Sequence, residues 1–138
     1  TEEKDFKKAA TLFEEVQRIY PLSIWAVRSE LMAAYAYYEA TNYTEAVATI
    51  DNFIQLHPVH KDLAYAYYLK GMCYYAQINS VNRDQENTMR SYLIFKEILE
   101  KFPTSVYAKD VKLKIDLTQE YLAGQDMEIG RFYQQQHY

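Results

Sequence analysis

The stretch YTEAVATIDNFIQLHP, residues 43–58, decides the fold, because its apolar side chains recur at helical spacing and the stretch ends at a proline. A small residue, Ala46, stands twelve positions before Pro58. Two large apolar residues, Ile50 and Phe53, stand eight and five positions before it. Since proline cannot continue a helix, this pattern predicts a helix with one packing face that ends near Pro58.

Two other segments repeat the arrangement at the same offsets from a proline. They are FKKAATLFEEVQRIYP, residues 6–21, and TMRSYLIFKEILEKFP, residues 88–103. The equivalent small and large residues are Ala9, Phe13, Val16, Ser91, Phe95 and Ile98. Three helices with the same packing face are therefore predicted, and together they indicate an internal repeat.

A second pattern precedes these helices. Ala34 and Tyr37 are repeated by Gly71 and Tyr74, which lie 37 residues later, the step that also separates the first two prolines. The third proline follows eight residues later than this step requires, and the excess falls in the polar stretch 79–88, which is predicted to be an inserted loop. A small residue, a tyrosine three positions on and a second helix ending at proline is the tetratricopeptide pattern, whose period is about 34 residues.

The sequence therefore predicts an all-α fold, a right-handed tetratricopeptide α-solenoid of about seven helices. Helices are expected at 3–20, 23–40, 43–57, 61–78, 87–102, 105–122 and 126–137. The chain is expected to be one solenoid fragment: 1–21 is the second helix of a truncated first repeat, 22–58 the second repeat, 59–103 the third repeat with the loop 79–88, and 104–138 a helix plus the start of a further repeat. The fragment is inferred because a solenoid with an unfinished end exposes an apolar face.

Composition argues against several classes of function. The 138 residues carry a net charge of −4 with scattered basic residues, which disfavours nucleic-acid binding. No apolar run reaches the roughly 20 residues that cross a bilayer. Neither a glycine-rich phosphate loop nor a nucleophile elbow is present, so no enzyme activity and no cofactor are expected. The 15 tyrosines, against 6 phenylalanines, favour half-wet surfaces and interfaces, because tyrosine has an apolar ring and a polar tip.

The histidines and the cysteine are interpreted as structural. His57 and His60, with Asp62, invite a metal site, but Pro58 separates the histidines, so they straddle a helix end instead of sharing a face. They are expected to be solvated turn residues, and no metal is expected. Cys73 is expected to be a buried small apolar residue, with a reactive thiol as the alternative.

One face of the first helix in each repeat carries the candidate binding residues, since first helices line the concave side of tetratricopeptide arrays. The hypothesis is a groove that binds an extended, aromatic-bearing peptide. Its residues are Arg28, Leu31, Tyr35, Tyr38, Tyr65, Tyr68, Met72 and Tyr75, to which a third helix adds Leu113, Leu117 and Tyr121. The alternative is that these tyrosines only pack between neighbouring repeats.

The inserted loop carries a further candidate. Arg83 and Asp84 lie just ahead of a predicted helix, where Asp84 can cap the helix or the pair can present a charged contact to a partner.

Several segments together resemble the BamD (ComL-like) lipoproteins, the tetratricopeptide subunit of the outer-membrane β-barrel assembly machine of Gram-negative bacteria. The segments are LMAAYAYYEATNYTEAVATIDNFIQLHP, AYAYYLKGMCYY, NRDQ, FPTSVYAKDVKLKIDLTQEYLAG and MEIGRFY, which span most of residues 31–133. AYAYYLKG, NRDQ and MEIGRFY at these separations carry most of the resemblance.

The resemblance implies a location and partners. Family members are anchored to the periplasmic face of the outer membrane by an acylated N-terminal cysteine and have about five repeats. Their N-terminal repeats are proposed to receive the C-terminal targeting signals of unfolded barrel proteins, and their C-terminal repeats mainly dock the periplasmic domain of the central barrel subunit (BamA-like). The lipidated cysteine is not in this sequence, because Cys73 is internal. Contact with the membrane is therefore expected only through an anchor outside this chain.

The resulting interpretation is a non-enzymatic binding scaffold for outer-membrane protein assembly. An extended peptide would enter the concave groove, with Arg28 available for its terminal carboxylate. The alternative is a purely structural adaptor that holds other assembly subunits and never contacts substrate.

Overall fold

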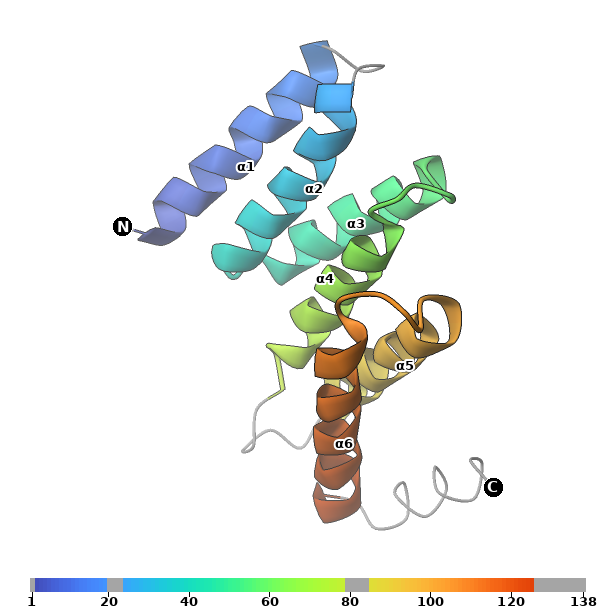
Figure 1. Ribbon diagram of the computed structural model, residues 1–138. Helices are drawn as coiled ribbons and strands as arrows, with labels where there is room; N and C mark the ends of the chain where they lie inside the picture. Colours follow the sequence, from blue (N-terminus) through green and yellow to red (C-terminus); the bar gives the residue numbers. More distant parts are fainter. Residues whose placement is uncertain (1, 20–23, 79–84, 126–138) are drawn as a thin grey trace.

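The chain folds into a stack of helices. The computed structural model describes residues 2–19, 24–78 and 85–125. Within these residues it has six helices and no strand: α1 (Glu2–Ile19), α2 (Ile24–Glu39), α3 (Tyr43–Leu56), α4 (Leu63–Tyr75), α5 (Glu86–Lys101) and α6 (Ala108–Gln125). Each helix packs against the next, from α1 at one end of the stack to α6 at the other, and α2 also contacts α4 (Figure 1). The all-α prediction is confirmed.

In α3 and α5 the repeated residues form the core, whereas in α1 the equivalent Ala9 and Phe13 are only partly buried. In α3 the three residues predicted to face inward, Ala46, Ile50 and Phe53, are fully buried and pack between α2 and α4. In α5 the equivalent serine, phenylalanine and isoleucine are also fully buried, and the two apolar ones pack with α6. Burial of large apolar side chains at these fixed offsets stabilises the stack by about 1.5–3 kcal/mol for each such side chain.

Gly71 allows α4 to approach α5 closely. A Cβ placed on Gly71 would lie 2.5 Å from Cε1 of Phe95, and Phe95 is fully buried, so its ring cannot easily move aside. Ala34, the equivalent residue of the preceding repeat, is also fully buried. The small position of the repeat is thus tightly packed between helices, as the sequence pattern indicated.

The turn between α2 and α3 is closed by a Schellman motif. The amide of Asn42 donates to the carbonyl of Tyr37 at 2.8 Å, and the amide of Thr41 donates to Tyr38 at 3.0 Å. Thr41 has a φ of 62°, the left-handed conformation that this motif needs at its turning residue. These two bonds satisfy the last carbonyls of α2 and direct the chain back into α3.

Several boundaries differ from the sequence prediction. The helix expected at 61–78 spans only Leu63–Tyr75, and the one expected at 105–122 begins at Ala108. α5 begins at Glu86, so the last residues of the stretch 79–88 expected as a loop are helical. The helix expected at 126–137 lies outside the described residues. In the described part of the chain, no helix is both long enough and apolar enough to cross a membrane.

Candidate peptide-binding face

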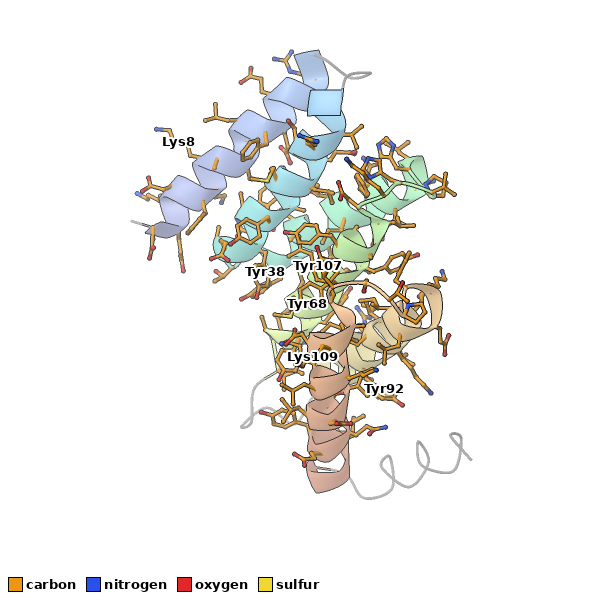
Figure 2. The ribbon with its side chains drawn as sticks, in the orientation of Figure 1. Lys8, Tyr38, Tyr68, Tyr92, Tyr107 and Lys109 are labelled. Atoms are coloured by element: carbon orange, nitrogen blue, oxygen red, sulfur yellow. The ribbon has the colours of Figure 1, made fainter. Side chains whose placement is uncertain are left out.

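Five tyrosines lie along α2, α4 and the start of α6 in a row whose rings contact one another within α2 and between α4 and the start of α6. This row, here called the tyrosine face, consists of Tyr35, Tyr38, Tyr65, Tyr68 and Tyr107. In α2 and in α4 the paired tyrosines are three residues apart, which places both rings on the same side of the helix. Figure 2 shows Tyr38, Tyr68 and Tyr107 gathered where α2, α4 and the start of α6 meet.

The ring contacts are closest at the α6 end of the row. The ring of Tyr107 stacks on that of Tyr68 with centroids 4.8 Å apart and planes 19° apart, and it lies 5.9 Å from the ring of Tyr65. At the α2 end, the centroids of Tyr35 and Tyr38 are 6.4 Å apart. Such pairs each contribute about 0.5–1.5 kcal/mol beyond the burial of their area.

The phenol groups of this row are neutral at physiological pH. Burial, followed by the neighbouring Tyr107, raises the pKa of Tyr65 to about 12. Burial is also the main cause that raises the pKa of Tyr38 and of Tyr107. The row therefore offers uncharged rings with polar tips, which suits contact with apolar and aromatic side chains.

Tyr68 is held by polar contacts as well as by stacking. Its hydroxyl donates to Oδ2 of Asp110 at 2.5 Å, and Nζ of Lys114 donates to both oxygens of the same carboxylate at 2.9 and 2.8 Å. Burial and the bond to Asp110 raise the pKa of Tyr68. Burial alone would raise the pKa of Asp110, but the bonds from Lys114 and Tyr68 outweigh it and lower that pKa. The Tyr68 hydroxyl is thus engaged in joining α4 to α6.

Two further predicted groove residues, Met72 and Tyr75, are half-buried between α4 and α5. Both pack against the cluster that contains Phe95, whose ring centroid lies 6.1 Å from that of Tyr75. Nζ of Lys114 sits 5.4 Å from the centroid of the Tyr75 ring. These side chains hold neighbouring helices together, which is the alternative that the sequence left open.

Leu31 is a correction to the predicted site. Only 6% of it is exposed, and it packs in the core cluster with Ala34 and Phe53. The reason is that α3 folds back over this side of α2, so the helix face that carries Leu31 turns inward. Leu31 belongs to the core and does not line a binding surface.

The α2 end of the row is open. Tyr35 is 40% exposed, and its hydroxyl interacts with Glu39, which raises the pKa of Tyr35. Met32 is 47% exposed and lies one turn from Tyr35, and Arg28 is exposed one turn before Met32. Arg28, Met32 and Tyr35, here called the open end, place a cation, a flexible thioether and an aromatic ring on one side of α2.

Sequence reasoning missed Met32 and Tyr107. Met32 follows the spacing of four and three that joins Arg28 to Tyr35, so its helical register could have identified it. Tyr107 lies just before α6, which begins later than expected. Its signal is an aromatic residue directly ahead of an inner helix, four residues after Pro103.

The predicted residues of α6 lie apart from these contacts. Leu113, Leu117 and Tyr121 are exposed and follow one another at single-turn intervals along the helix. Arg83 and Asp84, the predicted loop contact, lie outside the described residues.

His57 is not the solvated turn residue that the sequence suggested. Its Nε2 lies 3.2 Å from Oε2 of Glu30, a carboxylate in α2 that is only 2% exposed. Nδ2 of Asn52 donates to the other oxygen of Glu30 at 3.0 Å, and the His57 ring lies 4.9 Å from that of Phe53. His57 therefore joins the end of α3 to α2, a contact between residues 27 positions apart that local spacing does not reveal.

His60 and Cys73 are also structural. Nδ1 of His60 accepts the amide of Asp62 at 3.0 Å, close to the start of α4. Cys73 is buried, and burial raises the pKa of its thiol to about 12, so it is a poor nucleophile. In the described residues, no three His, Cys, Asp or Glu side chains come together to hold a metal ion.

Comparison with known proteins places the chain among outer membrane proteins. Residues 1–138 match the model of a family described as YfiO, outer membrane lipoprotein. A relative from Rickettsia prowazekii is 46% identical over 132 residues, and one from Caulobacter vibrioides is 42% identical over 129 residues. A third, from Neisseria meningitidis serogroup B, is 32% identical over 139 aligned positions. Each of these relatives is named outer membrane protein assembly factor BamD.

The chain spans about half the length of the curated relatives it matches. The alignments cover 96% of this chain and 53% of the Rickettsia protein, and 94% of this chain and 42% of the Caulobacter protein. For the Neisseria protein the shares are 94% and 52%.

Proposed function

We propose the function of this chain from one premise: the chain belongs to the YfiO family of outer membrane lipoproteins, whose model it matches from residue 1 to residue 138. It acts as a non-enzymatic binding scaffold in outer-membrane protein assembly, and the open end beside its tyrosine face receives the extended C-terminal peptides of unfolded outer-membrane proteins. The relatives' shared name, assembly factor, supports the general role. The observation that carries the finer role is the row of five aromatic rings with its open end at α2.

The two ends of the tyrosine face have different tasks in this proposal. Tyr68 and Tyr107 stack on one another, and Tyr68 bonds to Asp110, so this end keeps α4 and α6 aligned. The open end has the exposed area that a ligand needs. A peptide ending in an aromatic residue would place its last ring against Met32, one turn from Arg28, and a preceding side chain against Tyr35, where ring and thioether contacts are favourable.

Arg28 supplies the charge recognition. Its guanidinium is exposed two turns before Tyr35, and the terminal carboxylate of a bound peptide would pair with it through charge-assisted hydrogen bonds. Two turns of helix span about 11 Å, which matches about three residues of extended chain. The open end can therefore read the last three residues of a peptide.

Isothermal titration with a peptide that ends in phenylalanine tests this proposal. The chain should bind it, and Tyr35→Ala should weaken binding about tenfold, a typical loss for an aromatic anchor. Tyr121→Ala is the matched control, because Tyr121 is exposed to nearly the same degree on α6, and it should leave binding unchanged. No heat of binding at roughly millimolar peptide, with the fold intact, would refute the proposal.

Amidation of the peptide terminus isolates the part assigned to Arg28. If Arg28 pairs with the carboxylate, the amidated peptide should bind about as weakly to the wild-type chain as the free acid binds to Arg28→Gln. A free acid that binds Arg28→Gln and the wild-type chain equally well would show that the arginine has no such role.

A structural adaptor is the second candidate, and the bonding of Tyr68 favours it. A tyrosine whose hydroxyl and ring are both engaged inside the molecule contributes to rigidity more than to ligand contact. In that role the chain would hold other assembly subunits. The periplasmic domain of the central barrel subunit would be among them, bound mostly by repeats that correspond to the unmatched half of the longer relatives. Crosslinking from Tyr68 that captured only folded subunits would favour this reading.

A further inference from the structure

The face of α2 that carries the open end finishes in a carboxylate, Glu39. Arg28, Met32, Tyr35 and Glu39 follow one another at spacings of four, three and four, so all four lie on one side of the helix. The first and the last are eleven residues apart, a rise of about 16 Å along the helix axis. One face of α2 therefore has a cation near its start and an anion at its end.

Glu39 has no basic partner in the part of the chain that the structure describes. None of the ion pairs among those residues includes it. The last turn of α2 has no basic residue, and the sequence has neither lysine nor arginine between Arg28 and Lys61. A carboxylate in the last turn of a helix also lies near the negative end of the helix dipole, which disfavours it. Glu39 is thus an anion that its position does not favour and that no described ion pair neutralises.

Three aromatic rings lie next to this carboxylate. Tyr35 precedes Glu39 by one turn, and the interaction of its hydroxyl with the carboxylate is the main cause that raises the pKa of Tyr35. The ring centroid of Tyr38 lies 6.4 Å from that of Tyr35 and 5.9 Å from that of Tyr43, the first residue of α3. Burial raises the pKa of Tyr38 and of Tyr43, and the negative charge of Glu39 adds to the rise in both.

A carboxylate beside aromatic rings is suited to an organic cation. The carboxylate supplies an opposite charge, and the negative face of a tyrosine ring attracts an ammonium or guanidinium group. A metal ion would need several more oxygen or nitrogen ligands, and the described residues bring no three His, Cys, Asp or Glu side chains together. The ligand chemistry that fits Glu39 is therefore a lysine or arginine side chain.

We propose that Glu39, with the exposed ring of Tyr35 beside it, binds a lysine or arginine side chain of the same peptide whose terminal carboxylate pairs with Arg28. This inference rests on the proposed function and adds a second charged group to what the peptide must contain. An extended chain advances about 3.3 Å per residue, so about 16 Å along α2 corresponds to about five residues. The basic side chain therefore lies about five residues before the last one. The two charges also fix the direction of the peptide, with its carboxylate toward the start of α2.

Isothermal titration with a pair of peptides tests this inference. Both peptides end in phenylalanine, and five residues before it one has lysine and the other glutamine. The lysine peptide should bind the wild-type chain about fivefold more tightly, the combined effect of an exposed ion pair and a cation–π contact. This advantage should shrink as salt is added and should vanish in Glu39→Gln. The glutamine peptide should bind the wild-type chain and Glu39→Gln equally well.

Glu45→Gln is the matched control. Glu45 is an exposed carboxylate in the first turn of α3, and its replacement changes the net charge by the same amount, but it does not lie on the face of α2 that carries the open end. This variant should keep the fivefold advantage of the lysine peptide. Glutamine has the shape of glutamate, so both variants should fold, which circular dichroism checks.

A third peptide tests the distance between the two charges. Its lysine is moved to the residue next to the terminal phenylalanine, which in the proposed arrangement lies close to Arg28 and far from Glu39. The advantage over the glutamine peptide should then disappear, because the lysine no longer reaches the carboxylate.

Three results would overturn the role of Glu39. One is equal binding of the lysine and glutamine peptides to the wild-type chain. Another is an equal loss of the lysine advantage in Glu39→Gln and Glu45→Gln, which would mean that only net charge matters. The third is the same advantage wherever the lysine is placed. In all three cases binding of the glutamine peptide would still support the proposed function, whereas a failure of both peptides to bind would refute that function and this inference together.

Discussion

The tyrosines of α2 and those of α4 look alike in sequence and differ in the folded chain. Both helices contain the string AYAYY, at residues 34–38 and 64–68, yet Tyr35 is exposed whereas its counterpart in the string, Tyr65, is half-buried against Tyr107, and Tyr68 is stacked and hydrogen-bonded. The difference comes from their neighbours. α4 has Tyr107 and α6 packed beside its tyrosines, while Tyr35 and the open end of α2 point to solvent. An aromatic stripe therefore supports the stack on α4 of the third repeat, whereas on α2 of the second repeat its Tyr35 end is exposed to solvent.

The largest change in the free energy of unfolding is expected at the buried tyrosine of the pair, Tyr68. Tyr68→Ala removes a stacked ring and a bond to Asp110, so the free energy of unfolding should fall by about 2–3 kcal/mol. Tyr35→Ala should cost less than about 0.5 kcal/mol, because a substitution at an exposed position removes few contacts. Urea denaturation followed by circular dichroism measures both values. Equal losses in the two variants would contradict the division of roles.

The next effect concerns the small position of the two repeats. Gly71→Ala should lower the free energy of unfolding by about 1–2 kcal/mol, although alanine favours a helix, because the added methyl group meets the buried ring of Phe95. The reverse change at the equivalent site, Ala34→Gly, should cost about 1–2 kcal/mol, because it lowers helix propensity and removes a fully buried methyl group. Both are measured by urea denaturation. If Gly71→Ala were instead stabilising, the close approach of α4 to α5 would have to relax freely.

The smallest effect concerns the polar contact between α4 and α6. Asp110→Asn should lower the free energy of unfolding by about 1 kcal/mol at neutral pH, because it weakens bonds to Tyr68 and Lys114. The pKa of Asp110 is lower in the folded chain than in the unfolded one. Its stabilisation is thus complete above about pH 4, the ordinary range of the group, and is lost as the pH falls through the folded pKa.

Measuring the free energy of unfolding as a function of pH tests this prediction further. The difference in the free energy of unfolding between the wild-type chain and Asp110→Asn should be constant near neutral pH and should shrink in acid. A difference that grew in acid would mean that the carboxylate is not the form that Tyr68 and Lys114 stabilise.

The fold was predictable because a few packing residues at fixed offsets from a proline identify the repeat. Ala46, Ile50 and Phe53 are buried as their spacing from Pro58 indicated, and helices end close to the three prolines. Spacing within one helix reports which residues share a face. It does not report which neighbouring helix covers that face.

The errors in the candidate site follow from that limit. Leu31 shares a helix with Tyr35, but α3 covers Leu31 and leaves Tyr35 exposed. Glu30 of α2 meets His57 at the far end of α3, and nothing in their local sequence indicates the pair. Tertiary packing decides such cases, so the sequence could indicate an aromatic stripe as a pattern and could not divide it into core and surface.

Site-specific crosslinking tests the central claim, that the open end and not the α4 tyrosines contacts the peptide. A photoreactive phenylalanine derivative is placed at position 35 in one variant and at position 68 in another, and each is irradiated with a peptide ending in phenylalanine. We expect a strong adduct from position 35 that excess unlabelled peptide competes away, and little or none from position 68. An adduct only from position 68, or none from position 35 under conditions where titration shows binding, would contradict it.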